Sequence, residues 1–463
     1  MIRLLLFIFC LISSICKAQY NGVQPNVVLV LIDDLGDYSI DCDRIFFGGN
    51  LVGDIYAPYM RDSFDNWAVN YTRMNSTPVC TTSRLAILTG NYMSKAYHSF
   101  AHMEESSRTL AQELRWKGYT TGSWGKWQLN GRGTRTNPQF DGYNEYYDYD
   151  PSDTSTPFVF GYDHYLMNNF ETAANRFSNC GNYYLNGNAA CNLSEYGPQV
   201  MLENYLSWVE DQKNAHNPFF AFYNSQFTHN PYEPVPETGD YPLLVDDPDY
   251  FTDNLAYFDT VELKSIVDQI RLDPQLRQNT IIFVTADNGT QLNPDRIDTD
   301  CMGTIVEGEK VLSTYYATQV PMYVLYFGSK YNIPVGSQNN SLLQLEDIHA
   351  TILDLAGVQD VNDGISFADD FVSYVPTQTN RDCVYGYYET FRNDIDGNAN
   401  YPNNANAYLF DGTYWLDDLD RFYNISIDPT MNNPLNTSSL TGAELTAYNN
   451  LTAKFTNYDK VND

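Results

Sequence analysis

The chain has 463 residues, of which 43% are hydrophobic, 15% aromatic and 18% charged, and this mixture excludes a disordered chain and a fibre. Its formal net charge of −32 comes from 26 Lys and Arg against 58 Asp and Glu, so neither nucleic acid nor anionic lipid is expected as a partner. A small anionic substrate is compatible with this charge only if the few cationic side chains converge on one pocket.

Residues 1–18 are predicted to form a secretory signal peptide. Arg3 gives a short charged start, residues 4–15 are an apolar run too short to span a bilayer, and Ala18 is a small residue at the expected cleavage site. No later stretch could span a membrane, so we expect no membrane anchor. The mature protein is expected to be secreted or to reach a lysosome-like compartment through the secretory pathway.

Secretion would explain the sequons and the cysteine count. Two of the 8 cysteines lie in the leader, and the even set that remains favours disulfide pairing, with Cys180–Cys191 as the preferred bridge across a Gly/Asn-rich loop. The other pairings stay open. Glycosylation is expected at several of the sequons, which begin at Asn70, Asn75, Asn192, Asn339, Asn424, Asn436 and Asn450.

Strands and helices alternate along most of the mature chain. Asn26 to Ile32 is a continuous apolar run typical of a strand buried on both faces. Further strands are expected at residues 219–223, 280–285 and 321–327, and helices at residues 83–93, 107–117, 199–212, 254–270 and 342–355. This alternation predicts an α/β fold in which helices sandwich a mixed, mostly parallel central sheet.

Two regions depart from the alternation. Residues 141–192 are rich in Tyr, Asn, Gly and Asp, which indicates a long surface excursion of the kind that often builds specificity over a site. Residues 364–463 contain short aromatic runs at 383–388, 408–416 and 422–427, which predict a smaller C-terminal antiparallel β subdomain. Residues 19–363 would then form the main domain.

Polar side chains follow two of the expected strands. Asp33 and Asp34 come directly after the first strand, and Asp287 and Asn288 come after residues 280–285. Each pair alone is typical of a turn or a helix cap. Together they offer three carboxylates and an amide oxygen at the edge of the sheet where open α/β folds bind ligands, a set that suits calcium, or alternatively magnesium.

A cysteine precedes one of the expected helices. Cys80 lies near the N-terminus of the helix expected from Ser83, where the helix dipole and free N–H groups favour an oxyanion; a disulfide partner is the alternative. The stretch CTTSRLAILTG resembles the signature of the sulfatase family, Cys-x-Pro/Ala-Ser-Arg before a helix ending in Leu-Thr-Gly. In that family a formylglycine-generating enzyme oxidises the cysteine during secretion, and the hydrated formylglycine is the nucleophile.

The resemblance extends from Asn26 to about Asp428 and keeps the family's motif order: NVVLVLIDDLG, CTTSR, GYTTGSWGKWQL, QFTHNP, NTIIFVTADNG, and Lys310 ahead of QVPMYVLY. It implies an alkaline phosphatase-like fold with residues 19–363 as the sulfatase catalytic domain. It also implies that Asp33, Asp34, Asp287 and Asn288 are calcium ligands, that Cys80 is the formylglycine precursor, and that Arg84, Lys126, His229 and Lys310 neighbour the nucleophile, bind sulfate or act as the acid. These cations would make the pocket net positive.

Three positions depart from the family pattern. Thr82 stands where Pro or Ala is usual in the motif around Cys80, and the converting enzyme is sensitive to that position. Gln128 replaces a common histidine, and an amide cannot take a proton at neutral pH. Residues 315–317 read Tyr-Tyr-Ala where Glu-Gly-Gly is common, which puts the local backbone shape in question.

The resemblance implies a secreted sulfuric ester hydrolase acting on a sulfated small molecule or glycan. In the family mechanism the formylglycine hydrate attacks sulfur, calcium and the lysines hold the sulfate oxygens, and His229 or Lys310 protonates the leaving alcohol. Two alternatives stay open. One is a non-catalytic glycan-binding protein of the same fold, and the other is a phosphomonoester or phosphonate hydrolase.

Overall fold

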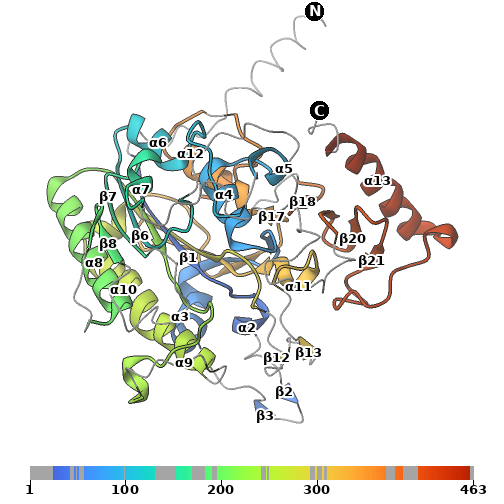
Figure 1. The fold of residues 1–463 in the computed structure, drawn as a ribbon, viewed down its shortest axis with the longest axis horizontal. Coiled ribbons are helices and arrows are strands. Elements are labelled where there is room, and N and C mark those ends of the chain that lie inside the picture. Colours follow the sequence, from blue (N-terminus) through green and yellow to red (C-terminus); the bar gives the residue numbers. More distant parts are fainter. Residues whose placement is uncertain are drawn as a thin grey trace, which may run out of the picture.

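In the computed structural model the chain folds around one large, twisted sheet with helices on both sides (Figure 1). The predicted α/β fold is confirmed. The structure describes residues 24–41, 46–47, 50–51, 57–97, 100–130, 153–168, 183–189, 195–240, 247, 250–291, 298–299, 305–306, 310–359, 361–371, 381–388 and 405–458.

The centre of the sheet is parallel and fully buried. Strand β1 (Asn26–Ile32) lies between β10 (Phe219–Asn224) and β11 (Thr280–Ala286), and every residue of these three strands is buried. Strand β6 (Thr120–Lys126) pairs with β10, also in parallel. An apolar strand packs well here because both faces of the sheet are covered. Parallel pairing brings the C-terminal ends of β1, β6, β10 and β11 to one edge.

The sheet continues in both directions to ten strands, in the order β16-β4-β15-β11-β1-β10-β6-β7-β8-β9. On one side lie β15 (Met322–Leu325), which is antiparallel to β11, β4 (Ala68–Tyr71) and β16 (Ser337–Asn339). On the other side lie β7 (His164–Asn168), β8 (Tyr183–Leu185) and β9 (Asn188–Ala189). The predicted excursion, residues 141–192, is therefore partly an extension of the sheet, in which Tyr165 and Tyr183 are buried.

Two groups of helices cover the sheet (Figure 1). One group contains α4 (Cys80–Thr89), α5 (Met93–Ala96), α6 (Leu110–Trp116) and α12 (Leu345–Leu355). The other contains α3 (Pro58–Trp67), α8 (Gly197–Ala215), α9 (Tyr250–Tyr257), the π-helical turn η4 (Phe258–Leu263) and α10 (Lys264–Leu272). The helix expected at residues 254–270 thus contains a π-helical turn, a feature that periodicity does not reveal.

The C-terminal part is a separate four-stranded antiparallel sheet of β18 (Val384–Tyr387), β19 (Ala407–Phe410), β20 (Tyr414–Asp417) and β21 (Phe422–Asn424). The strand expected at residues 408–416 is a hairpin, because the chain turns at Gly412, whose φ of 90° favours glycine. Helix α13 (Gly442–Tyr458), which the sequence analysis did not identify, packs on this sheet through Ala447 and Leu451.

Short elements complete the described fold. They are α2 (Tyr38–Asp41), β2 (Phe46–Phe47), β3 (Asn50–Leu51), β5 (Met74–Asn75), α7 (Thr156–Val159), η3 (Pro236–Thr238), η5 (Leu276–Gln278), β12 (Asp298–Thr299), β13 (Ile305–Val306), α11 (Tyr315–Thr318), β14 (Gln319–Val320), β17 (Leu343–Gln344), η6 (Ala368–Phe371) and η7 (Thr437–Ser439).

Several expectations tied to secretion fall outside the described residues, among them the signal peptide and Cys42, Cys180, Cys191 and Cys301, so the Cys180–Cys191 bridge stays a prediction. The two described cysteines, Cys80 and Cys383, are both free thiols. Asn75 and Asn339 are buried with their amide nitrogens bonded inside the protein, which is incompatible with a glycan in this fold. Across the described residues, no helix combines the length and the apolar character needed to cross a membrane.

Candidate active site

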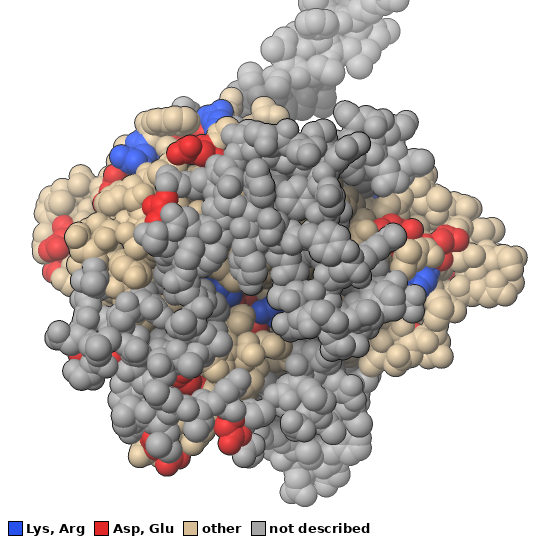
Figure 2. Space-filling view, viewed as in Figure 1, with Lys and Arg blue, Asp and Glu red and all other residues tan. Residues whose placement is uncertain are grey.

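The predicted site residues meet at the C-terminal edge of the central sheet. Hydrogen bonds, ion pairs and electrostatic interactions connect all ten of them: Asp33, Asp34, Cys80, Arg84, Lys126, Gln128, His229, Asp287, Asn288 and Lys310. Figure 2 looks onto this face, where basic and acidic side chains are visible in a hollow near its centre. The edge is where parallel α/β sheets bind ligands.

Cys80 occupies the first turn of α4, which begins three residues earlier than the sequence predicted. Val79 is extended, and a cluster of hydroxyls closes the turn: the Thr82 hydroxyl donates to the Val79 carbonyl at 2.9 Å and lies 2.5 Å from the Thr77 hydroxyl. Thr82 is thus accommodated by local hydrogen bonds. The Cys80 thiol is buried and donates to Gln128 Oε1 at 3.2 Å.

Arg84 follows one turn later on α4 and is buried, with 1% of its surface exposed. Its guanidinium donates to Asp287 Oδ2 at 2.9 Å, to Asn224 Oδ1 at 3.0 Å and to the Lys126 carbonyl at 3.1 Å. Burial acts to lower the pKa of Arg84, but Asp287 and Asp33 outweigh it and the pKa rises. The residue therefore carries a permanent positive charge and joins three strand ends.

The two lysines bind the aspartates that follow β1. Lys126 Nζ donates to both oxygens of Asp33 at 2.7 Å, and Lys310 Nζ donates to Asp34 Oδ2 at 2.7 Å. Burial acts to raise the pKa of Asp33, but Lys126 and the other cations more than offset it and the pKa is lowered, so this carboxyl is ionised. For Asp34, burial is the largest effect and leaves the pKa above its ordinary value.

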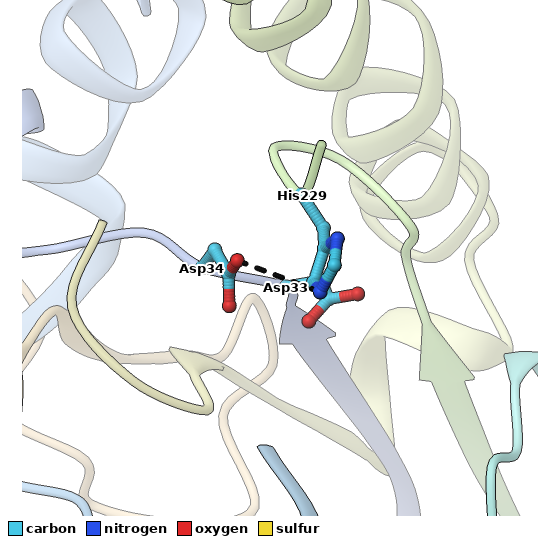
Figure 3. Close-up of side chains that lie close together, drawn as sticks. All are labelled: Asp33, Asp34 and His229. Atoms are coloured by element: carbon cyan, nitrogen blue, oxygen red, sulfur yellow. Dashed lines mark ion pairs between the residues drawn. The ribbon is translucent and has the colours of Figure 1, made fainter. Parts of the chain in front are cut away.

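His229 enters the site from the loop after β10. Figure 3 shows its ring beside Asp33 and Asp34, with Nε2 at 3.7 Å from Asp34 Oδ2. Its Nδ1 lies 2.5 Å from the Asn230 carbonyl, so Nδ1 carries a hydrogen and donates it. With Nδ1 protonated, Nε2 is the nitrogen that can take or give a proton in the pocket.

The acidic residues have the chemistry of a cation site. Asp33, Asp34 and His229 offer ligand atoms that all lie within 4.8 Å of one another. The amide oxygen of Asn288 is buried and lacks a hydrogen-bond partner among the described residues, and a bound cation would satisfy it. Hard carboxylate and amide oxygens are the ligands that calcium prefers, so Asp33, Asp34 and Asn288 fit the predicted metal, whereas the His229 nitrogen is not a ligand that calcium favours.

Asp287 forms hydrogen bonds that connect parts of the site, and its carboxyl group also affects the charge there. It accepts from Arg84 through one oxygen and from the Asp34 backbone N–H, at 3.0 Å, through the other. Burial first, and then the nearby Asp33 carboxylate, raise the pKa of Asp287 to about 7. An added cation would favour its ionised form.

Backbone conformation at the site is constrained. Asp34 and Gln128 have φ values of 61° and 58°, which non-glycine residues rarely adopt. Gly125, at φ 94°, is required, because a Cβ there would lie 1.8 Å from the Asn224 carbonyl oxygen. The segment from Tyr315 forms the helical turn α11, and its Ala317 carbonyl accepts from the Gly289 N–H at 2.8 Å, so the unusual sequence still supports the turn after β11.

Asn224 is a site residue that the sequence analysis missed. It is the last residue of β10, and its amide oxygen accepts from Arg84. The signal was present in the sequence, since a polar side chain ends the apolar run FFAFYN just as Asp33 ends the first strand.

Known proteins resemble this chain over most of its length. A family model described as Sulfatase matches residues 25–358. The ulvan-active sulfatase of Formosa agariphila is 25% identical over 225 residues, which are 48% of this chain and 39% of that protein. Arylsulfatase G of Mus musculus is 24% identical over 381 residues, which are 76% of this chain and 69% of that protein. The solved structure of the PsFucS1 sulfatase from Pseudoalteromonas sp. has a TM-score of 0.67 at 18% identity, covers 95% of this chain and 91% of its own, and shows the same fold.

Proposed function

Because the chain belongs to the sulfatase family, a family of sulfuric ester hydrolases, we propose that it hydrolyses a sulfate monoester with a formylglycine formed from Cys80. The proposal depends on one observation above all. Cys80 lies at the N-terminus of α4 within a cluster that also holds Arg84, Lys126 and Lys310, so cations of an acidic protein converge where an oxyanion would react.

Formylglycine would supply a hydrated aldehyde whose hydroxyl attacks sulfur. The other side chains of the site would bind the sulfate and hold the nucleophile in position. Lys126 and Lys310 would bind sulfate oxygens by exchanging part of their bonding to Asp33 and Asp34, whereas Arg84, held by Asp287 and Asn224, would keep the strand ends together and add positive potential. Gln128 can accept a hydrogen bond from position 80 but cannot act as a base.

His229 is the proposed acid. Its Nδ1–H is engaged by the Asn230 carbonyl, so Nε2 is the atom that would give a proton to the leaving alcohol. Asp34 Oδ2 lies 3.7 Å from this nitrogen, so the Asp34 carboxyl is the nearest acidic group to the proposed proton donor among the described residues. Lys310 is the alternative donor, but its ion pair with Asp34 raises its pKa despite burial, which disfavours proton release.

Asp33, Asp34, Asp287 and Asn288 would hold calcium, with magnesium as the alternative, and the metal would stabilise negative charge on the sulfate oxygens. The four side chains come from the ends of β1 and β11, and Asn288 Nδ2 lies 2.7 Å from Asp34 Oδ1, which ties the two strand ends together.

The proposed substrate is a sulfated small molecule or glycan, in line with relatives described as arylsulfatase G and as ulvan-active. We also propose passage through the secretory pathway, where a formylglycine-generating enzyme would be the partner that converts Cys80. The leader-like residues 1–18 support this route.

The test is product release from a matched pair of esters, 4-nitrophenyl sulfate and 4-nitrophenyl phosphate, by wild type and by Cys80→Ala. Sulfate release by wild type that the variant loses supports the proposal. Faster phosphate release would favour the phosphomonoesterase alternative. A folded wild type that releases neither product would favour a glycan-binding protein.

A further inference from the structure

A buried carboxyl group lies behind the candidate active site and has no place in the proposed chemistry. Glu262, in the π-helical turn η4, is 0% exposed. Its Oε1 accepts from the Tyr223 hydroxyl at 2.9 Å, and its Oε2 accepts from the Ser225 hydroxyl at 2.7 Å. Tyr223 lies in β10, and Ser225 is the first residue after that strand, so Glu262 holds the strand at the point where the loop of His229 begins.

Ser225, Phe227 and Thr228 connect the loop of His229 to the end of β1. The Ser225 hydroxyl accepts from the Phe227 N–H at 3.3 Å, and the Phe227 carbonyl accepts from the Asp33 N–H at 2.8 Å. The Thr228 N–H donates to the Asp33 carbonyl at 2.6 Å, and the Thr228 hydroxyl donates to the Asp34 carbonyl at 3.1 Å. A single chain of hydrogen bonds therefore runs from Glu262 through Ser225 to the loop that carries His229.

We propose that Glu262 is a positioning residue, whose bond to Ser225 fixes the loop of His229 against Asp33 and Asp34 and so places the His229 imidazole for proton transfer. The part that concerns proton transfer rests on the proposed function. The part that concerns loop position rests on the hydrogen bonds alone.

The surroundings of Glu262 support a neutral, permanently bonded carboxyl. The groups that lie near it are the Ser225 hydroxyl and the tyrosines Tyr223, Tyr257 and Tyr196, and no described cation is close enough to offset its burial. Burial raises the pKa of Glu262 to about 8, so at neutral pH it is an uncharged group, in which one oxygen accepts a hydrogen bond and the protonated oxygen donates one, so that the bond to one of the two hydroxyls runs from Glu262. Such a group fits two hydroxyl partners without placing a charge beside His229.

The same π-helical turn offers a matched control. Asp259 is also buried, three residues earlier, but its oxygens accept from the Tyr59 and Met60 N–H groups at the start of α3, away from the loop. Replacing Asp259 should therefore weaken the helix packing without moving His229. Comparison of the two sites separates a general loss of structure from a loss of loop position.

The catalytic test uses the full chain with Glu262→Leu, Glu262→Gln and Asp259→Asn, on 4-nitrophenyl sulfate and phenyl sulfate. A displaced acid matters most for the poorer leaving group, phenol. We expect Glu262→Leu to lower kcat/KM on phenyl sulfate by about tenfold or more and to have a much smaller effect on 4-nitrophenyl sulfate, because kcat/KM reports the leaving-group step even where sulfate elimination limits turnover. Glu262→Gln should restore wild-type values, because its amide also donates and accepts. Equal losses on both substrates would overturn the proton-transfer part of the inference.

Hydrogen exchange measured by mass spectrometry tests the loop independently of activity. Glu262→Leu should speed exchange in peptides that cover residues 225–232, while Asp259→Asn should instead affect peptides that cover residues 57–67. Unchanged exchange at residues 225–232 would overturn the inference even in an active enzyme, and a wild type without sulfatase activity would refute the proposed function while leaving this measurement decisive. If Glu262→Leu does not fold, Ser225→Ala breaks the same bond from the other side.

Discussion

The most quantitative prediction concerns the protonation of Glu262. Burial raises its pKa in the folded protein to about 8, from an ordinary value of 4.5, so the folded state holds a proton that the unfolded chain has released. The stability that this group contributes is fully present below the unfolded pKa and is lost as the pH rises through the folded pKa. Wild type should thus lose stability from pH 5 to pH 8 on account of this residue.

Glu262→Gln removes the titration and keeps the shape. One pKa unit corresponds to about 1.4 kcal/mol. Between pH 5 and pH 8 the free energy of unfolding of the variant should therefore rise by on the order of 3 kcal/mol relative to that of wild type. An unfolding entropy of about 2.1 cal/mol/K per residue gives a chain of this length a total unfolding entropy of about 1 kcal/mol/K. The difference in Tm between the variant and wild type should therefore change by roughly 3 °C over this pH range.

The assay is thermal unfolding of both proteins at pH 5, 6, 7 and 8, with only the difference in Tm used at each pH. Asp259→Asn is the matched control, because burial raises the pKa of Asp259 only to about 6. The difference in Tm between this variant and wild type should therefore level off above about pH 6. A Tm difference between Glu262→Gln and wild type that stays constant from pH 5 to pH 8 would refute the assignment of a neutral buried carboxyl.

Three further predictions follow from the site. Calcium should raise the Tm of chelator-treated wild type but not of Asp287→Asn, since a cation that binds the native state stabilises it; an equal rise in the variant would exclude Asp287 as a ligand. Gln128→His should speed steady turnover with little effect on a pre-steady-state burst, measured by stopped flow, and unchanged rates would deny this position a proton role. Arg84→Met should lower the free energy of unfolding, measured in urea, by about 3–5 kcal/mol, because it leaves Asp287 buried without its partner. A loss below about 1 kcal/mol would contradict a buried Arg84–Asp287 ion pair.

The sequence was sufficient for the apolar strands and their polar ends. The runs that became β1, β10 and β11 have continuous apolar patterns, and once they lie side by side in parallel, Asp33, Asp34, Asp287 and Asn288 must meet. The order of the sulfatase motifs identified Cys80, Arg84, Lys126, His229 and Lys310 as site residues. Local pattern alone would have left Lys126 and Lys310 as surface lysines, His229 as a turn residue and Cys80 as a disulfide partner.

Other features depend on tertiary contacts that no local pattern encodes. Strand β6 was not predicted because TTGSWGK has small and polar residues, which are stable there only because β10 and β7 flank them. The start of α4 at Cys80 depends on hydroxyl bonds from Thr77 and Thr82. Glu262 looked like one of many acidic helix residues, and only the packing of η4 on β10 makes it a buried partner of Ser225.

The most direct measurement is the mass of the tryptic peptide that contains Cys80. Cleavage after Arg73 and Arg84 releases MNSTPVCTTSR from protein secreted by its native host. If the chain is a formylglycine-dependent sulfatase, this peptide carries an aldehyde in place of the thiol, and its fraction should scale with the sulfatase activity of each preparation. A wholly unmodified Cys80 in that protein would contradict the proposed nucleophile.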